Sequence, residues 1–304
     1  AACAIITASY LSDGKVLAFS YLKHHPGARF YLLIVDAAAG DIDAVPGVCV
    51  ITGRELGLPY FRELCFKYSP TELCCALKPT LLQLLLRKYG EEQIVYLDSD
   101  ILVLQRLDRV LECLSSADIV LTPHLLEPIP DDGFAPSEQD ILVAGTCNLG
   151  FLAIRKSPAV LKFLPWWQER LRDGGFIEFS QGLLTDQRWV DLVPSLFSAT
   201  LLKDPAYNVA YWNIHSRPIT REGDVFLVNG RSPLAFFHFS GFDPAAPTVF
   251  SKHQNRTSLV PRSGLAELID LYVRLQMEDG FGSCRGRKYA FGGFDNGVAI
   301  SAPI

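Results

Sequence analysis

The first third of the chain alternates strand-like and helix-like segments, and this alternation constrains the fold more than any other feature. Short apolar runs predict strands, and longer segments whose apolar residues recur with a period near 3.6 predict helices. The predicted strands are residues 3–7, 30–35, 48–52 and a fourth starting at residue 94, and the predicted helices are residues 12–24 and 70–89. Strands that alternate with helices favour a sheet of mostly parallel strands covered by helices. We therefore expect an α/β, Rossmann-like fold with a mixed, mostly parallel sheet.

The rest of the chain continues this pattern less regularly. We expect strands at residues 118–122 and 150–154, a loop at 124–140, helices at 157–171, about 181–190 and 265–277, and a hairpin of residues 225–228 and 234–239. The hairpin is predicted from Asn229-Gly230, a dipeptide typical of tight turns. Pro79 is expected to break or kink the helix at 70–89, because proline lacks an N–H and clashes with the preceding turn.

Composition excludes several classes of protein. The 304 residues suffice for one large domain or two small ones, and 49% hydrophobic with 20% charged residues predicts a substantial core. A net charge of −5 argues against a general nucleic-acid binder. No apolar run is long enough to span a membrane, although peripheral association stays open, and the N-terminus has no signal-peptide pattern. We expect a cytoplasmic protein whose eight cysteines are reduced.

Two aspartates interrupt the apolar stretch "IVYLDSDILVL" at residues 94–104. Asp98 and Asp100 lie just past the apolar end of a predicted strand, where open α/β sheets place their ligands. Residues two apart can point to one side, so both carboxylates can reach one hard cation. The alternative is a turn capped by aspartates, and the pattern alone leaves both interpretations open.

Several short motifs occur in the order found in one enzyme family. The stretch around Asp98 and Asp100 resembles the D-x-D strand of GT-A sugar-nucleotide transferases, especially the retaining glycosyltransferase family 8, which includes glycogenin and bacterial lipooligosaccharide galactosyltransferases. The other matching segments are "IITASY" (5–10), "CNLGFLAI" (147–154), "LLTDQRWVD" (183–191), "DPAYNVAYWN" (204–213) and "FFHFSG" (236–241). The resemblance covers most of residues 3–243. It implies a GT-A domain at 1–255, with a nucleotide-binding half at 1–105, a donor-sugar and acceptor half at 106–255, and a C-terminal helical and loop extension at 256–304.

The resemblance implies a metal site. Asp98 and Asp100 would hold a metal ion on the diphosphate of the donor, and His238 would be the third protein ligand. Without the resemblance, a histidine between two phenylalanines is more often a core or turn residue. Two carboxylates and one imidazole suit Mn²⁺ or Mg²⁺, and Mn²⁺ tolerates nitrogen better.

The resemblance also implies residues that bind a UDP-sugar donor. Besides the two aspartates, they are Thr7, Ala8, Tyr10, Lys78, Ser99, Asn148, Gly241 and Lys252. Tyr10 would stack on the base, Lys78 would contact phosphate or sugar, and Asn148 would hydrogen-bond the sugar. The alternatives are helix-entry packing for Tyr10, an ordinary surface lysine for Lys78 and a turn-forming role for Asn148.

Asp186 and Gln187 match the residues that the family places on the β-face of the donor sugar. They would stabilise oxocarbenium-like charge while the leaving phosphate takes the acceptor proton in a front-side attack. The alternative is that Asp186 caps a helix, since Thr185-Asp186 also reads as a helix N-terminus.

The sequence departs from the family pattern at two places. The family follows H-x-x-G with a lysine two or three residues later, whereas this chain has Phe242 and Asp243 there. Lys252, which follows a Pro/Ala stretch, is the candidate replacement. Arg188 stands where bacterial members commonly have an acid. Both departures affect contacts with the donor sugar and phosphates.

The sequence therefore predicts a metal-dependent retaining glycosyltransferase that moves a hexose from a UDP-sugar to a glycan or protein acceptor, in bacterial glycan biosynthesis. A haloacid-dehalogenase-like phosphatase also places D-x-D after an apolar strand, but the later acidic pair of that class has no counterpart here. A non-catalytic sugar-nucleotide or glycan-binding module is another alternative. A nucleotidyltransferase would have a Gly-rich basic loop after the first strand, which "TASYLSDGK" at residues 7–15 matches poorly.

Overall fold

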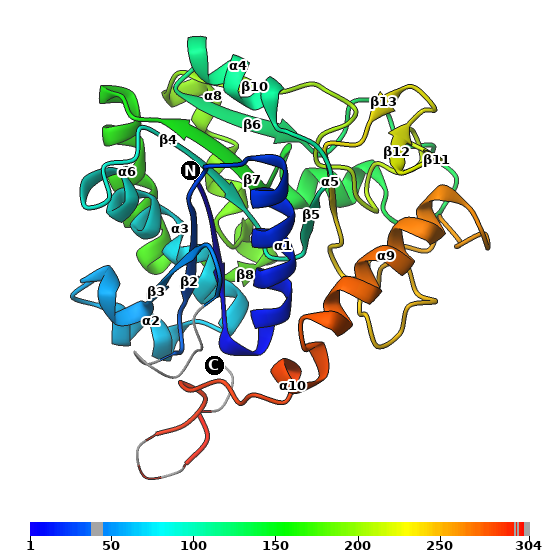
Figure 1. Cartoon of the computed structure of the whole chain (residues 1–304). Helices are drawn as coiled ribbons and strands as arrows, with labels where there is room; N and C mark the ends of the chain where they lie inside the picture. Colours follow the sequence, from blue (N-terminus) through cyan, green and yellow to red (C-terminus); the bar gives the residue numbers. More distant parts are fainter. Residues whose placement is uncertain (38–44, 295, 297, 301–304) are drawn as a thin grey trace.

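The chain folds around a seven-stranded sheet with helices on both faces (Figure 1). The structure is a computed structural model and describes residues 1–37, 45–294, 296 and 298–300. The strand order is β10-β6-β7-β4-β1-β2-β3. These strands are β1 (Ala2–Ile6), β2 (Phe30–Ile34), β3 (Val48–Thr52), β4 (Gln93–Leu97), β6 (Ile119–Pro123), β7 (Cys147–Arg155) and β10 (Ala199–Leu201). Only β7 runs antiparallel to its neighbours β4 and β6, so the predicted mixed, mostly parallel sheet is confirmed.

Alternate residues of each strand enter two separate cores. In β1, Ala2, Ala4 and Ile6 pack in the core under α1, α4 and α9, whereas Cys3 and Ile5 pack in the core under α2, α3 and α6. These helices are α1 (Leu11–His24), α4 (Asp108–Ser116), α9 (Gly264–Glu278), α2 (Phe61–Lys67), α3 (Pro70–Arg87) and α6 (Pro158–Asp173). Because both faces are buried there, the central strands β1 and β2 do not alternate between apolar and polar residues.

The order of the strands reverses between β1 and β4. From β1 the chain passes through α1 to β2 and β3 on one side, whereas β4 joins β1 on the other side. Open α/β sheets bind ligands at such a reversal, outside the carboxyl ends of the strands. The carboxyl ends of β1 and β4 therefore mark the expected site.

A small two-stranded sheet joins two distant parts of the chain. β14 (Phe236–His238) pairs antiparallel with β5 (Ile101–Val103), and His238 stands opposite Ile101. The predicted hairpin was therefore wrong in its second strand: β12 (Val225–Val228) pairs with β11 (Ile219–Glu222) and the short β13 (Ser232–Pro233). Phe236 and Phe237 are fully buried in the main core, and this burial draws residues 236–238 away from the hairpin.

Two expectations about helices are also wrong. α3 is continuous through Pro79, because its buried contacts with the sheet and with α6 offset the loss of one backbone hydrogen bond. Residues 181–190 are not one helix, since Gly182 and Thr185 both have positive φ and interrupt it. This region contains β8 (Ile177–Glu178), the 3₁₀ turn η3 (Phe179–Gln181), β9 (Leu183–Leu184), α7 (Gln187–Val190) and α8 (Val193–Leu196).

Two of the remaining connections contain short 3₁₀ turns. The 3₁₀ turn η1 (Ala8–Tyr10) follows β1, and η2 (Gly53–Leu56) follows β3. The predicted loop at 124–140 is interrupted at its end by α5 (Glu138–Ala144), which begins at a capping box of Ser137 and Asp140.

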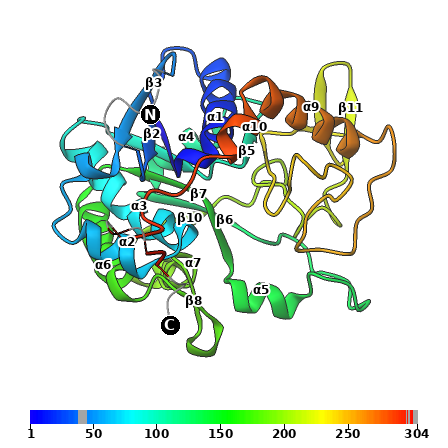
Figure 2. The same cartoon turned by 90° about the horizontal axis from the view of Figure 1, so that it is seen from below.

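The C-terminal region packs against the first strand–helix unit (Figure 2). α9 confirms the predicted helix, and Tyr272 within it stacks on Phe239 with ring centroids 3.8 Å apart. A short helix, α10 (Phe281–Arg285), follows and lies against η1 and α1. In the described part of the chain, no helix combines the length and apolarity needed to cross a membrane.

The core under α3 allows a test of this packing. Leu77→Ala should lower the free energy of unfolding by about 2–5 kcal/mol, because Leu77 is fully buried between α3 and the sheet. Leu111→Ala on α4, where the side chain is 37% exposed, is the matched control and should have a much smaller effect. Urea denaturation measures both, and equal losses would contradict this core assignment.

Candidate active site

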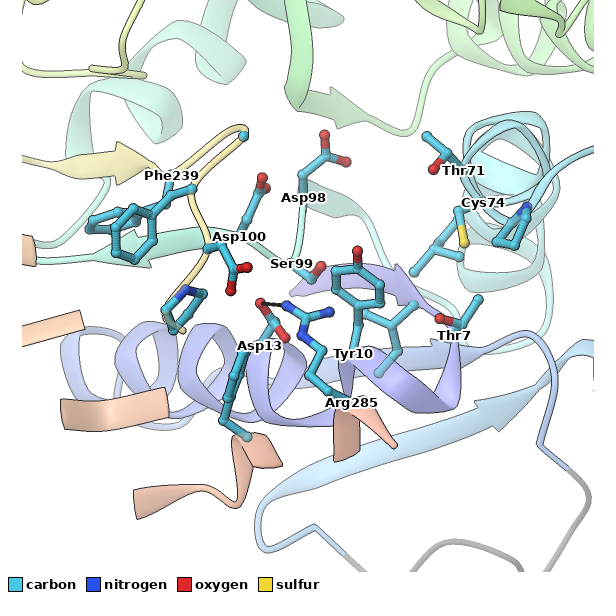
Figure 3. Close-up of a pocket in the computed structure, with 18 of the residues that line it drawn as sticks. Thr7, Tyr10, Asp13, Thr71, Cys74, Asp98, Ser99, Asp100, Phe239 and Arg285 are labelled. Carbon is cyan, nitrogen blue, oxygen red and sulfur yellow. Dashed lines mark hydrogen bonds and ion pairs between the residues drawn. The ribbon is translucent and has the colours of Figure 1, made fainter. Parts of the chain in front are cut away.

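A cavity of about 740 Å³ opens at the carboxyl ends of β1 and β4. Its wall includes eight of the predicted donor-site residues: Thr7, Tyr10, Lys78, Asp98, Ser99, Asp100, Gly241 and Lys252. Figure 3 shows Asp98, Ser99 and Asp100 beside Tyr10 at this cavity. Residues predicted from separate motifs are therefore brought together at the reversal of the sheet.

Asp98, Asp100 and His238 converge within this region. One potential ligand atom from each lies within 4.8 Å of the others. Asp98 donates its backbone N–H to the carbonyl of Gly150 at 2.8 Å, and Phe239 donates its N–H to the carbonyl of Asp100 at 2.8 Å. These backbone bonds fix the aspartate loop to β7 and β14, so the three side chains are held by neighbouring strands.

His238 and Asp100 form an ion pair. Nε2 of His238 lies 3.0 Å from Oδ1 of Asp100. Burial alone would lower the pKa of His238, but Asp100 outweighs burial and raises the pKa. Burial alone would likewise raise the pKa of Asp100, and His238 lowers it instead. A cation bound by all three side chains would supply positive charge beside Asp98 and Asp100.

The orientation of His238 depends on two residues behind it. Nδ1 lies 3.3 Å from Oδ1 of Asn208, which accepts its hydrogen and leaves Nε2 to face the carboxylates. Gly150 leaves room for the ring, since a Cβ at this position would lie only 2.7 Å from Nδ1. The N-x-G motif is thus explained by the space that the histidine occupies.

Asn148 and Gln187 belong to a buried amide network and do not appear in the cavity wall. Oδ1 of Asn148 accepts hydrogen bonds from Asn208 and from the backbone N–H of Gly150, both at 3.1 Å. Nδ2 donates to His124 at 3.3 Å and to Gln187 at 3.4 Å. Burial lowers the pKa of His124 to about 4, so its ring is neutral at neutral pH. The network connects Gln187 to the residue that orients His238.

Lys78 is almost completely buried between two acids. Its Nζ lies 2.9 Å from Oδ2 of Asp186 and 3.4 Å from Oδ1 of Asp98, and it donates to the carbonyl of Leu149 at 2.9 Å. Burial alone would lower the pKa of Lys78, but Asp186 and Asp98 outweigh it and raise the pKa above its usual value. Tyr96 donates its hydroxyl to Asp98 at 2.8 Å. The lysine therefore links the aspartate of the D-x-D motif to Asp186.

Asp186 is the N-cap residue directly before α7, but its side chain makes no capping hydrogen bond there. It is 2% exposed and accepts a hydrogen bond from Thr185 at 3.0 Å in addition to its ion pair with Lys78. Thr185 has φ 47°, a left-handed conformation that is unfavourable for a β-branched residue. The capping alternative therefore does not describe this side chain.

The loop that follows β1, residues 7–10, also contributes to the cavity. Tyr10 is 45% exposed and lines the cavity, and Thr7 bonds Ser9 through their hydroxyls at 2.9 Å. Ala8 is not in the wall, and its backbone N–H donates to Oδ1 of Asp36 at 2.7 Å. Sequence reasoning missed Asp36, although a carboxylate directly after the predicted strand at 30–35 was an available signal.

A tight loop returns Lys252 to the cavity. Its backbone N–H donates to the carbonyl of Gly241 at 3.0 Å. Gly241 has φ 71°, and a Cβ there would lie 2.7 Å from Oγ of Ser251. Glycine is therefore required by both conformation and space. Lys252 reaches the region where the family lysine was missing, and His253 lines the same wall.

Further cavity residues were not predicted from the sequence. They include Asp13 and, from the C-terminal region, Tyr272, Phe281 and Arg285. No local pattern identifies them, because their position depends on how α9 and α10 pack on α1.

Sequence comparison finds relatives without an assigned activity. No protein-family profile matches the chain. It is 29% identical over 190 residues to the uncharacterized protein YfnF of Bacillus subtilis (strain 168), a match that spans 60% of this chain and 61% of YfnF. It is 24% identical over 246 residues to the uncharacterized protein YfnD of the same organism, spanning 78% and 76% of the two chains. The chain thus covers less than two thirds of YfnF.

Comparison of structures is more informative about the fold. The glycosyltransferase GlyE of Streptococcus pneumoniae TIGR4 aligns with a TM-score of 0.53 at 16% identity, over 93% of this chain and 63% of GlyE. The galactosyltransferase LgtC, solved with donor and acceptor sugar analogs, aligns with a TM-score of 0.50 at 14% identity, over 91% of this chain and 95% of LgtC.

The chain has the GT-A fold. This confirms the fold class predicted from the motifs. It argues against the haloacid-dehalogenase alternative, whose D-x-D motif belongs to a different fold. Within the GT-A fold, the aspartate pair lies where the sheet order reverses and where the cavity opens.

Gly150 provides a test of how the metal site is built. Gly150→Ala should weaken the binding of Mn²⁺ by roughly tenfold or more, because the added Cβ displaces the His238 ring. Gly282→Ala is the control, since a Cβ there meets nothing within 4 Å. Calorimetric titration with Mn²⁺ measures both variants, and unchanged affinity in Gly150→Ala would contradict the role of His238 as a ligand.

Proposed function

We propose that this chain is a metal-dependent retaining glycosyltransferase that transfers a hexose from a UDP-sugar to a glycan or protein acceptor. The observation that carries the proposal is the convergence of Asp98 and Asp100, which line the cavity together with Tyr10, with the buried His238 next to it. A cation site next to an accessible aromatic ring suits a nucleoside diphosphate, because the ring can stack on the base while the cation faces the diphosphate.

The three candidate metal ligands fit a divalent cation. Two carboxylates and one imidazole agree with Mn²⁺ or Mg²⁺, and Asn208 already fixes the ring of His238 through Nδ1. When bound, the ion supplies positive charge that neutralises the diphosphate leaving group. The protein residues would bind the ion through Asp98, Asp100 and His238.

The remaining residues suggest how the donor is held. Tyr10 and Lys252 both line the cavity, and we propose that Lys252 contacts phosphate oxygens of the donor. Lys78 is engaged by Asp186 and Asp98, so we propose that it positions these carboxylates instead of serving as the main phosphate ligand. Asn148 and Gln187 support this wall from behind through the amide network.

The proposal that the reaction retains the configuration at the anomeric carbon rests on the motif resemblance. The burial of Asp186 is compatible with this proposal. Asp186 is 2% exposed and paired with Lys78, which disfavours direct attack by its carboxylate on the sugar. In a front-side reaction, the bond from the anomeric carbon to phosphate breaks and the bond to the acceptor oxygen forms on the same face. The acceptor proton passes to the leaving phosphate oxygen. Asp186, with Gln187, would stabilise the positive charge that develops on the sugar.

The cellular context belongs to the same proposal. We propose a cytoplasmic enzyme of bacterial glycan biosynthesis with no nucleic-acid partner. All eight cysteines are free thiols, as expected in a reducing compartment. The competing hypothesis is a sugar-nucleotide-binding module without activity, and turnover measurements distinguish the two.

The metal ligands give the direct test. The wild-type chain should hydrolyse a UDP-hexose slowly in the presence of Mn²⁺, and UDP with Mn²⁺ should raise its melting temperature. Asp100→Ala and His238→Ala should abolish the Mn²⁺-stimulated hydrolysis, because each removes a ligand. A screen of UDP- and GDP-sugars, with and without Mn²⁺, identifies the donor used for the measurement.

Asp108→Ala and His24→Ala are the matched controls, since Asp108 is exposed and neither residue lines the cavity. Wild-type hydrolysis in Asp100→Ala or His238→Ala would overturn that ligand assignment. If UDP stabilises the chain but no sugar is transferred to a tested acceptor or to water, the result would favour the binding module. Robust cleavage of p-nitrophenyl phosphate would favour a phosphatase.

The proposed role of Asp186 in turnover can be tested separately from the binding of UDP. Asp186→Asn should lower kcat by at least about tenfold while leaving UDP affinity nearly unchanged, as expected for a contact made in the transition state. Asp191→Asn is the control, because this acid pairs with Arg188 outside the cavity. Calorimetry that shows a parallel loss of UDP affinity in Asp186→Asn would make the residue a structural partner of Lys78.

A further inference from the structure

The C-terminal region contributes a cation to the cavity. Arg285, the last residue of α10, lines the same wall as Asp98, Asp100 and Tyr10. Figure 3 shows its guanidinium between Tyr10 and Asp13, facing the space in front of Ser99 and Asp100. The motif resemblance assigned no role to residues after 256.

Three contacts hold this guanidinium in place. Its carbon lies 3.7 Å from the centroid of the Tyr10 ring and 5.1 Å from that of Phe281. Nη2 lies 3.2 Å from Oδ1 of Asp13, whose side chain is 4% exposed. Cys284 and Phe281 are buried beside α1, so α10 itself is anchored. The side chain is therefore preorganised and not a solvated surface arginine.

The position of Arg285 leaves it able to bind a ligand. The side chain is 27% exposed, and among the described residues it donates one hydrogen bond, to Asp13. A guanidinium has five N–H donors in a planar fork that matches phosphate oxygens. Tyr10 remains 45% exposed although Arg285 covers part of its ring, so a base can still stack on it.

The cavity offers few cationic side chains to an anionic ligand. Three Lys or Arg side chains line it: Lys78, Lys252 and Arg285. Lys78 is engaged by Asp186 and Asp98, as described above. Among the residues that the structure describes, four acids also line the wall, Asp13, Asp98, Asp100 and Asp243, and they oppose an anionic ligand. Two cations, Lys252 and Arg285, are thus left to face a diphosphate.

We propose that Arg285 of the C-terminal extension binds the diphosphate of the nucleoside diphosphate donor, with Tyr10 and Asp13 positioning its guanidinium. This deepens the proposed function and rests on it. The extension would then complete the donor site instead of only covering α1. Lysine cannot replace Arg285 fully, because an ammonium group can neither stack on Tyr10 in the same way nor present a planar pair of donors.

The test compares UDP with uridine. In the presence of Mn²⁺, Arg285→Ala should weaken UDP binding by about tenfold or more, as expected for loss of a hydrogen bond between charged groups. Arg285→Lys should recover part of this affinity. Uridine, which lacks phosphates, should bind wild type and Arg285→Ala alike when saturation-transfer NMR measures the two.

Arg287→Ala is the matched control. Arg287 is exposed and makes no ion pair in the described part of the chain. Melting temperatures without ligand show whether each variant is folded. UDP affinity within twofold of wild type in a folded Arg285→Ala would overturn the inference and leave the proposed function intact. An equal loss for uridine and UDP would also overturn it, because Arg285 would then act on the base through Tyr10. Absence of UDP binding by the wild-type chain would overturn both proposals.

Discussion

The pairing of β14 with β5 is the interaction on which the candidate site depends. It places His238 opposite Ile101 and therefore next to Asp100, although the two residues are far apart in the sequence. Phe236 and Phe237 anchor β14 because both are fully buried in the core. Successive residues of a strand point to opposite sides, so a slip of one residue would turn His238 away from the aspartates. The geometry of the candidate metal site is thus set by core packing and by the register of a short sheet.

The same site concentrates charge that is expensive to bury. Four ion pairs join these acids to three basic side chains: Lys78 pairs with Asp186 and Asp98, His238 pairs with Asp100, and Arg285 pairs with Asp13. Breaking a buried pair by removing one partner usually destabilises a protein strongly, because the remaining charge is left without compensation. A divalent cation with a diphosphate would add charges of both signs and keep this balance. The arrangement therefore suits a ligand that is itself an ion pair.

The sequence predicted the local features of this site and missed the long-range ones. Strand ends and the aspartate pair could be located because apolar periodicity and turn residues are short-range signals, whereas the glycine of the N-x-G motif was located through the family resemblance. The left-handed Asn208 and the contribution of Arg285 could not, since both depend on packing between distant segments. Pro79 shows the opposite error. The rule that proline breaks or kinks a helix predicted an interruption there, but the buried surroundings of α3 keep the helix continuous. The helix expected at 181–190 is interrupted because Gly182 and Thr185 adopt positive φ. Apolar periodicity carries no information about such backbone angles.

Strain and buried charge occur together at Thr185 and Asp186. Thr185 adopts φ 47° and donates its hydroxyl to Asp186, whose carboxylate then faces Lys78 and makes no capping bond to α7. A helix cap alone would need neither the unfavourable backbone nor a fully buried lysine, because an exposed aspartate caps a helix at lower cost. Such a combination of strain and paired buried charges is typical of functional sites. Since Lys78 also contacts Asp98, one buried cation joins Asp186 to an aspartate of the candidate metal site. Asp186, Lys78 and Asp98 are therefore parts of one electrostatic unit, in which Asp186 and Lys78 are buried and Asp98 faces the cavity.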